Sequence, residues 1–455
     1  APDAPLVGVR SMARLMCHVG RPEYPARRRA VTRKVFAWGF PTCDKHMAAL
    51  PSFGPAVHST DRERALLGGV VFAVLFAQVL LYPGIDTLVT ALGAPAVLEA
   101  STWFLGVELA ASVAFVWLWG AVSDRRGVRV PLIRAGAVVA AASYALLATV
   151  PQATGLPFVG ALAVRAVQGA ATVGVLSLAM TMLMDLPGGH GRNMGAAGVA
   201  VGAGTALGAP VGGLLYERGP FVPLAAAALL TLSIAVLSTR LADRAPTGMG
   251  GRGGIAGIAA RVRATPGLAV PYAFGFIDRL SAGGFALAGT LYFRTEFGLS
   301  PTATGLLLFC FFGPFALFQY PFGALSDRLG RAIPVVVGSV GYGLGVAAVG
   351  LAPSAVAAGV AMAVVGVVGA FMSPATMALV TDLASETDRG VAMAGFNATA
   401  SVGFLAGVVL GGAVAGAAGF ATVFLVAGAV EIVLALVAAP AVVRLAGRRA
   451  SEATA

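Results

Sequence analysis

Charged residues are scarce in this chain. Of its 455 residues only 11% are Asp, Glu, Lys or Arg, whereas 58% are hydrophobic. A soluble domain has about 25% charged and about 45–50% apolar residues, and it cannot hide so large an apolar excess below its surface. The composition therefore excludes an ordinary water-soluble protein and indicates a chain whose solvent is lipid.

Cysteine and histidine are also rare, with three and four copies. Cys17 and Cys43 lie in a polar leader and Cys310 lies in an apolar run, a spacing that predicts neither a disulfide framework nor a metal site. No histidine lies inside an apolar run. We therefore expect no metal and no cofactor.

Features of an enzyme or of a nucleic-acid-binding protein are missing as well. The sequence contains no nucleotide loop of the G-x-x-x-x-G-K-[ST] type and no evident nucleophile–base pair. The net charge of +11 is not accompanied by a basic patch interleaved with aromatic residues. We expect neither an enzyme nor a nucleic-acid partner.

Long apolar runs are abundant. A membrane-spanning helix needs about 20 mostly apolar residues, and twelve segments qualify. Short linkers require neighbouring helices to be antiparallel, so we expect an all-α integral membrane protein. The expected spans are Leu66–Thr90, Trp103–Gly120, Leu132–Val150, Leu156–Leu183, Gly195–Tyr216, Phe221–Thr239, Leu268–Tyr292, Ala303–Leu325, Ile333–Leu351, Ala355–Val380, Val391–Gly416 and Ala421–Val442.

Arginines lie almost entirely on one side of this topology. If the first helix leaves the cytoplasm, sixteen arginines fall in cytoplasmic loops and the C-terminal tail, and only Arg218 and Arg294 fall on the opposite side. Because basic residues mark cytoplasmic loops, we expect a multi-pass protein of the cell membrane with both termini in the cytoplasm.

Composition divides the chain into five parts. Residues 1–64 hold eleven of the 31 basic residues and lack the apolar core of a signal peptide, which indicates either a disordered extension or a wrongly assigned start at this end. A six-helix bundle at 65–240 follows. A glycine-rich cytoplasmic linker at 241–266 separates it from a second bundle at 267–443, and 444–455 form a cytoplasmic tail.

One charged loop occurs twice. Residues 120–129 are GAVSDRRGVR and residues 323–332 are GALSDRLGRA, each ending the second span of its half. Asp185 precedes Arg192 by the same interval as Asp382 precedes Arg389. Two six-helix halves related by repetition are typical of a secondary transporter.

On these residues the chain resembles the major facilitator superfamily, over roughly residues 65–445. The family's loop motif is G-x-[LV]-x-D-R-x-G-R-[RK]; the first copy departs at Val128 and the second has Ala332 in place of the last base. The resemblance implies the twelve-helix, two-repeat major facilitator fold, and loops that latch the helices. Physically, Asp124 would cap the N-terminus of a neighbouring helix, and the arginines would bind carboxylates or anionic lipid. The alternative is that these charged residues only reflect the excess of basic residues in cytoplasmic loops. The latch residues are Gly120, Asp124, Arg125, Gly127 and Arg129, then Gly323, Asp327, Arg328, Gly330 and Arg331.

A second family motif, R-x-x-Q-G-x-[GA], lies in the fourth span as Arg165, Gln168, Gly169 and Ala171. An arginine inside an apolar helix costs about 2.5–3.5 kcal/mol on insertion scales, so it should face the bundle interior and have a partner. The resemblance ties this arginine to proton coupling; a purely structural arginine is the alternative.

A third motif lies in the fifth span. The family's antiporter motif is G-x8-G-x3-G-P-x2-G-G, which the chain matches except that its proline is displaced by one position. Such glycines make a smooth face for close helix contact. In the family this motif accompanies export of the substrate, and the resemblance is strongest to the twelve-span drug:proton antiporters. Tight helix packing alone is the other explanation. The residues are Gly195, Gly204, Gly208, Pro210, Gly212 and Gly213.

Acidic residues inside the spans are candidate functional sites, because a charged side chain inside the membrane costs free energy. A proton-coupled exporter needs a carboxylate that takes up a proton near neutral pH, which burial favours by penalising the charged form. Asp278 and Glu108 are the leading candidates, Asp86 is third, and Glu431 is the weakest because the twelfth helix is usually peripheral in the family. A structural ion pair is the alternative for each.

Asn397 in the eleventh span is a further candidate. Its amide would either bind substrate or bridge two helices. With Asp278, Glu108, Asp86, Arg165 and Gln168 it completes the predicted proton-coupling and substrate site.

Three functions compete. The first is a monomeric, lipid-embedded antiporter that exchanges protons for lipophilic or cationic small molecules by alternating access. The second is proton-coupled uptake or exchange of a metabolite such as a sugar or organic acid, which the small number of cavity amides disfavours. The third is a non-transporting membrane receptor or assembly factor on the same scaffold.

Overall fold

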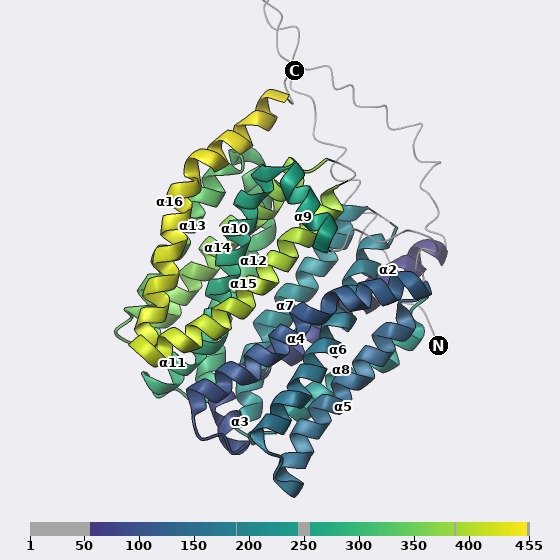
Figure 1. The fold of residues 1–455 in the computed structure, drawn as a ribbon, viewed down its shortest axis with the longest axis vertical. Coiled ribbons are helices and arrows are strands. Elements are labelled where there is room, and N and C mark those ends of the chain that lie inside the picture. The colour runs from purple at the N-terminus through teal and green to yellow at the C-terminus, as the bar shows by residue number, and fades with distance from the viewer. Residues whose placement is uncertain (1–54, 188, 244–254, 386–387, 453–455) are drawn as a thin grey trace, which may run out of the picture. The chain divides into compact units, whose positions relative to one another are not determined.

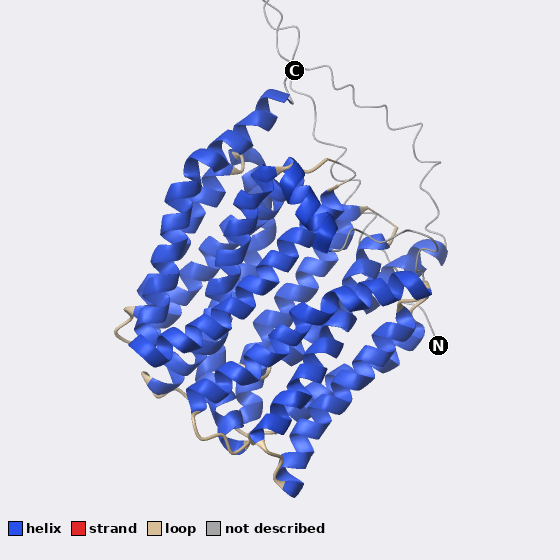
Figure 2. Cartoon of the chain, viewed as in Figure 1, coloured by secondary structure: helices blue, strands red, loops and turns tan. Residues whose placement is uncertain are grey.

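The computed structural model describes residues 55–187, 189–243, 255–385 and 388–452. Within those ranges every regular element is a helix (Figure 2). Most of the expected N-terminal extension lies outside the described residues. The first helix, α2, begins at Pro55, ahead of the expected boundary after residue 64.

Ten of the twelve expected spans are single helices long and apolar enough to cross a membrane. Their ends differ from the expected ones by several residues, mostly outward. They are α4 (Val97–Arg126), α5 (Val130–Thr154), α6 (Phe158–Asp185), α7 (His190–Tyr216), α8 (Val222–Leu237), α12 (Pro301–Leu329), α13 (Ala332–Gly350), α14 (Ala355–Leu383), α15 (Arg389–Ala418) and α16 (Phe420–Glu452).

The first span is broken near its end, so the expectation of one helix over Leu66–Thr90 is wrong there. It consists of α2 (Pro55–Val79) and α3 (Ile85–Ala91). Pro83 has no backbone N–H to continue the helix. Gly84 packs against the Tyr216 ring, where an added Cβ would lie 2.6 Å from Cγ. The Tyr216 hydroxyl donates to the Leu81 carbonyl oxygen at 3.0 Å and so satisfies a backbone group in the break.

The seventh span also departs from a uniform α-helix. It runs through η2 (Pro266–Leu268), α10 (Ala269–Gly284), the π-helical turn η3 (Phe285–Gly289) and α11 (Thr290–Thr295). A π turn widens the helix by one residue and often lies near a functional site.

Short elements connect the spans. A 3-10 turn, η1 (Ser238–Arg240), ends the first half, and α9 (Ile255–Ala264) lies within the expected linker. Most of the glycine-rich run GMGGRGGIAG lies outside the described residues. Helix α16 continues into the expected tail, to Glu452.

The two halves pair their helices in the same way (Figure 1). In the first half α2 packs on α7, α4 on α6 and α5 on α8. In the second half α10 packs on α15, α12 on α14 and α13 on α16. The halves meet through α7 with α12 and α4 with α15. The structure therefore shows the two-repeat helical fold expected from the sequence.

Candidate functional site

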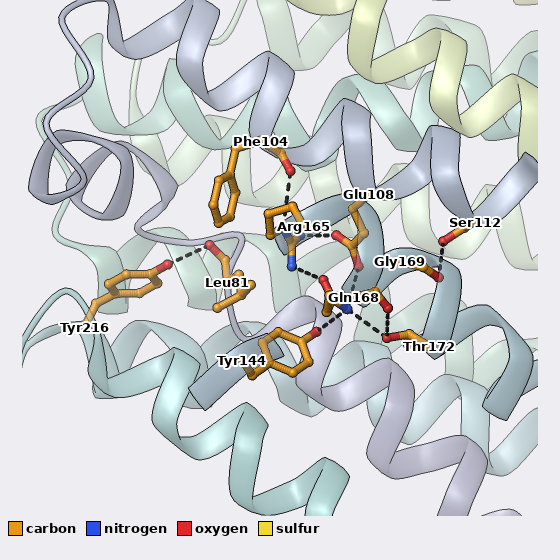
Figure 3. Close-up of polar contacts among 10 residues, drawn as sticks. All are labelled: Leu81, Phe104, Glu108, Ser112, Tyr144, Arg165, Gln168, Gly169, Thr172 and Tyr216. Atoms are coloured by element: carbon orange, nitrogen blue, oxygen red, sulfur yellow. Dashed lines mark hydrogen bonds and ion pairs between the residues drawn. The ribbon is translucent and has the colours of Figure 1, made fainter. Parts of the chain in front are cut away.

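A buried polar cluster lies in the interior of the first half (Figure 3). Arg165 and Gln168 come from α6, Glu108 from α4 and Tyr144 from α5, and all four are at most 2% exposed. The Arg165 guanidinium donates to Glu108 Oε2 and to Gln168 Oε1. Gln168 Nε2 donates to the Tyr144 hydroxyl at 3.0 Å and to Thr172 Oγ1 at 2.8 Å. The cluster thus ties three helices together.

The charge of Arg165 is almost fully satisfied. Its Nε donates to the Phe104 carbonyl oxygen at 3.3 Å, and the guanidinium lies 4.5 Å from the centroid of the Phe104 ring. A buried charge is tolerated when it is paired and hydrogen-bonded. The structure therefore supplies the partner that the sequence required for Arg165, and it holds Glu108 in a closed ion pair.

Small residues of α6 allow this pairing. A Cβ at Gly169 would collide with the Glu108 carbonyl oxygen, and one at Gly174 would collide with the Trp119 ring. Trp119 Nε1 in turn donates to the Ala170 carbonyl oxygen at 2.6 Å. The glycine of the R-x-x-Q-G motif is thus required for α4 and α6 to approach closely enough for the Arg165–Glu108 bond.

Asp278 has a different environment in the second half. Its side chain on α10 is 13% exposed, and its ion-pair partner among the described residues is Arg279, whose Nε lies 3.9 Å from Asp278 Oδ2. Arg279 itself is 42% exposed. The alternative for Asp278 was a structural ion pair. Such a pair with an arginine on another helix is not found among the residues that the structure describes. Asp278 is therefore a buried acid held much more loosely than Glu108.

The structure does not bring Asp86 or Asn397 to either acid. Asp86 lies in the first turn of α3, where Arg294 of α11 donates to Asp86 Oδ2 from Nε at 2.9 Å. Arg294 Nη2 also donates to Thr87 Oγ1 at 3.1 Å. Asn397 on α15 has an exposed side chain. Asp86 is thus part of a bridge between the halves, on the side opposite the arginine-rich loops.

We expect Asp86→Asn to loosen this bridge. A partly exposed ion pair contributes about 1 kcal/mol, so roughly a fivefold shift toward separation of the halves at this end should follow. Labelling of a Thr102→Cys thiol on α4 by a membrane-impermeant maleimide should rise accordingly. Glu99→Gln, which removes an exposed acid near the same end, should leave labelling unchanged, and equal labelling in both variants would refute the bridge.

Each copy of the repeated loop contains a glycine with positive φ and an arginine that pairs with an aspartate on another helix. Gly127 and Gly330 end α4 and α12 with positive φ angles of 63° and 79°, which favour glycine. Arg129 Nη1 then donates to Asp185 Oδ2 at 2.7 Å, and Arg331 Nε donates to Asp382 Oδ2 at 3.1 Å. Asp185 and Asp382 are therefore the partners of Arg129 and Arg331, which stand at the tenth and ninth positions of the two copies.

The expected capping role of Asp124 is wrong. Asp124 is exposed in the last turn of α4, and α5 begins without a side-chain cap of its own. Asp243, which the sequence did not single out, instead accepts a hydrogen bond from the Arg129 backbone N–H at 3.1 Å. Asp327 pairs with Arg331, while Arg125 and Arg328 are exposed. These exposed groups remain available to lipid or to another conformation of the loops.

Comparison with known proteins places this geometry in a family. The model of the Major Facilitator Superfamily matches residues 67–270 and again residues 271–454. The chain belongs to the major facilitator superfamily. As a member of that family it is a multi-pass membrane transporter and not an enzyme.

A curated relative matches a short stretch of this major facilitator chain. The Multidrug efflux pump LfrA of Mycolicibacterium smegmatis is 34% identical over 106 residues, which cover 23% of this chain and 21% of that protein. The match therefore spans about a fifth of that relative's length.

Solved structures support the fold alone, because their sequence identities are low. The human organic anion transporter MFSD10 (TETRAN) superimposes with a TM-score of 0.61 and 20% identity over 83% of this chain and 99% of its own. The nucleoside transporter NupG superimposes with a TM-score of 0.67 and 15% identity, over 84% of this chain and 98% of its own. A D-xylose-proton symporter superimposes with a TM-score of 0.65 and 16% identity, over 83% of this chain and 96% of its own.

The glycine motif of the fifth span packs α7 on α2. A Cβ at Gly204 would lie 2.9 Å from the Phe72 carbonyl oxygen, and one at Gly212 would collide with the Leu80 carbonyl oxygen. Gly213 faces the other half, where a Cβ would collide with the Pro301 carbonyl oxygen. Gly195 has open space around it. The motif thus serves both the packing of the first half and its contact with the second.

The same spacing recurs in α15, and the sequence analysis missed it. A Cβ at Gly403 or Gly407 would collide with carbonyl oxygens of α10, and one at Gly412 would collide with Thr102 Oγ1 of α4. Four glycines of α15 repeat the spacing of the last four glycines of the motif in α7, without its first glycine and its proline: Gly403, Gly407, Gly411 and Gly412. In this major facilitator chain the pattern belongs to the architecture of both halves, so by itself it does not indicate export.

Gly212→Ala is expected to destabilise the protein by about 1–3 kcal/mol, because the added methyl group overpacks α7 against the α2 backbone. Gly195→Ala should instead be neutral or slightly stabilising, since alanine favours the helix by up to about 1 kcal/mol. Thermal unfolding of both variants in detergent tests this contrast. Equal unfolding temperatures would contradict the packing role of Gly212.

Proposed function

We propose that this transporter is a proton-coupled antiporter that exports lipophilic or cationic small molecules by alternating access. It acts in the cell membrane with its arginine-rich side and both termini in the cytoplasm, and it acts as a monomer. Protons and substrate exchange at the second half, where Asp278 is the coupling acid.

The observation that carries this proposal is the contrast between the two buried acids. Glu108 is fixed by Arg165 and Gln168, whereas Asp278 is held only loosely by the half-exposed Arg279. A coupling acid must gain and lose its proton during the cycle, and a loose partner permits both states. In this scheme Arg165, Gln168 and Glu108 form a rigid frame, and Asn397 is a substrate contact of α15.

The contacts between the halves are consistent with one state of alternating access. At the side opposite the arginine-rich loops the halves join through Asp86 with Arg294 and through Thr302 with Glu217, whose Oγ1 and Oε1 lie 3.1 Å apart. Toward the arginine-rich side, Gly120 and Gly390 have open space around them. This arrangement fits a state that opens toward the cytoplasm.

A reconstituted transport assay tests the proposal. Proteoliposomes with an acidic lumen should accumulate ethidium, a permanently charged lipophilic cation, and a protonophore should abolish the accumulation. The partial match to a multidrug efflux pump supports this choice of probe. Ethidium movement that ignores the pH gradient would refute antiport.

A second function rests on Arg279. A half-exposed arginine inside the membrane suits an organic anion, because it can bind a carboxylate directly. In the same vesicles, pH-driven movement of succinate without movement of ethidium would favour this alternative, namely uptake or exchange of an organic acid.

A further inference from the structure

An apolar groove lies on the second half, between α10 and α16. It has a volume of about 770 Å³ and is lined by side chains of α9, α10, α15 and α16. Helix α16 packs on α10, α13 and α15 of its own half, whereas the halves meet through other helices. Val433 and Val437 of α16, which line the groove, are 58% and 75% exposed. The groove therefore opens on the outside of the bundle, where a membrane-spanning helix faces lipid.

The surface of the groove is almost entirely hydrocarbon. Among its lining residues only Tyr272 and Thr399 carry a polar group. Both hydroxyls donate to backbone carbonyl oxygens of α15, at 2.6 and 2.9 Å. The acids Asp278 of α10 and Glu431 of α16 are buried and do not line the groove. Because a polar group loses its hydrogen bonds to water in such a place, the groove suits a hydrocarbon chain.

The length of the groove matches one leaflet of a membrane. Its lining residues on α10 extend from Ala269 to Ile277, which is about 12 Å along an α-helix. One leaflet contributes roughly 15 Å to the hydrocarbon core. Ala269 is the first residue of α10, so the groove begins on the arginine-rich side and extends toward the middle of the membrane. It therefore covers the depth of an acyl chain in the leaflet on that side.

Two arginines flank the groove on the arginine-rich side. Arg263 lies in the last turn of α9, directly after the lining residue Val262. Arg444 follows the lining residue Val437 by seven residues, about two turns of α16, and so lies on the same face of that helix. Both arginines are exposed, and neither has an ion-pair partner within the described ranges. Their positive charges are therefore available to an anion at this end of the groove.

Helix α9 is attached to the second half. Arg261 of α9 donates to Asp388 Oδ1, and a Cβ at Gly395 of α15 would lie 3.0 Å from Ile258 Cγ2 of α9. Figure 1 shows α9 toward the same end of the second half as the last turns of α16. An ion pair and close packing thus fix the place of Arg263 beside the groove.

We propose that the groove holds an acyl chain of an anionic phospholipid, whose phosphate lies against Arg263 and Arg444. Basic side chains between membrane-spanning helices on the cytoplasmic side bind lipid headgroups, and arginine forms strong hydrogen bonds to phosphate. The same two charges repel a lipophilic cation, so this lipid site is separate from the cation site proposed at Asp278. The proposal depends neither on proton coupling nor on the direction of transport.

Native mass spectrometry of the full-length protein in detergent tests the headgroup contacts. Phosphatidylglycerol should bind at least about fivefold more tightly than phosphatidylcholine with the same acyl chains. Arg263→Gln and Arg444→Gln should each raise the apparent Kd for phosphatidylglycerol about fivefold, the usual contribution of one basic residue near anionic lipid. Arg240→Gln, which removes an exposed arginine from the same side of the first half, is the matched control and should leave this Kd unchanged.

A groove-filling variant tests where the acyl chain lies. Ala429→Phe adds a ring to a lining residue of α16 and should weaken binding of both lipids at least severalfold. Leu436→Phe, at an exposed position of the same helix outside the lining, should not. Unchanged phosphatidylglycerol binding in both arginine variants, or in Ala429→Phe, would overturn the proposal; if Ala429→Phe does not fold, the arginine variants decide alone. Loss of ethidium binding in Ala429→Phe would assign the groove to substrate and would also overturn it.

Discussion

The Asp278→Asn variant is expected to lose pH-driven ethidium accumulation entirely, while exchange of ethidium down its own gradient continues. Asparagine is neutral at every stage of the cycle, so it cannot exchange a proton for a cationic substrate. It also keeps nearly the shape of Asp278 and avoids the cost of a cavity. Because the side chain is buried and its partner Arg279 is loose, we expect the fold to tolerate the change.

Two measurements in the same vesicles check this result. Accumulation with an acidic lumen should fall at least about tenfold, to the level found without a gradient. Counterflow of labelled against unlabelled ethidium at equal pH should remain within about twofold of the wild type. Glu296→Gln, which removes an exposed acid beyond the end of α11, should alter neither. Full accumulation by Asp278→Asn would remove Asp278 from the mechanism.

Removing one member of the Arg165–Glu108 pair should have the largest effect on stability. Glu108→Ala leaves the Arg165 guanidinium buried without its counter-charge, which costs about 3–5 kcal/mol in comparable pairs. The hydrogen bond to the Phe104 carbonyl oxygen and the adjacent ring offset only a small part of that loss. The variant should therefore unfold at a much lower temperature in detergent or fail to accumulate in the membrane.

A double substitution separates charge from packing. Glu108→Leu combined with Arg165→Met removes both charges and fills similar space, and such replacements are often neutral or stabilising. The double variant should be more stable than Glu108→Ala. If it is as unstable as the single variant, the pair is not the source of the loss.

Much of the fold followed from the apolar runs alone. Length and hydropathy place a helix in lipid because an unsatisfied backbone costs several kcal/mol there. The break at Pro83 was not predicted, because a proline in an apolar run does not reliably mark a helix break. Helix α12 continues through Pro314 and Pro321, and α14 continues through Pro374. Only the packing of Gly84 against Tyr216 and the hydrogen bond to Leu81 distinguish the first span.

The candidate site was predictable residue by residue but not as an arrangement. The cost of a buried charge required a partner for Arg165, yet no spacing rule identifies Glu108 on another helix. The same holds for Asp86 and Arg294, which are 208 positions apart. Glu431 was ranked last because its helix is peripheral, and a helix's place in the bundle does not reveal which of its faces is buried. The glycine repeat in α15 is visible in the sequence, but it does not match the family motif because it lacks the motif's proline.

The most direct test of the account is the count of protons released when substrate binds. Ethidium added to purified protein in weakly buffered detergent solution near neutral pH should acidify the solution, because a cationic substrate and a proton compete for the second half. Asp278→Asn should bind ethidium without that acidification. Proton uptake on binding, or no change in the wild type, would contradict proton-coupled antiport.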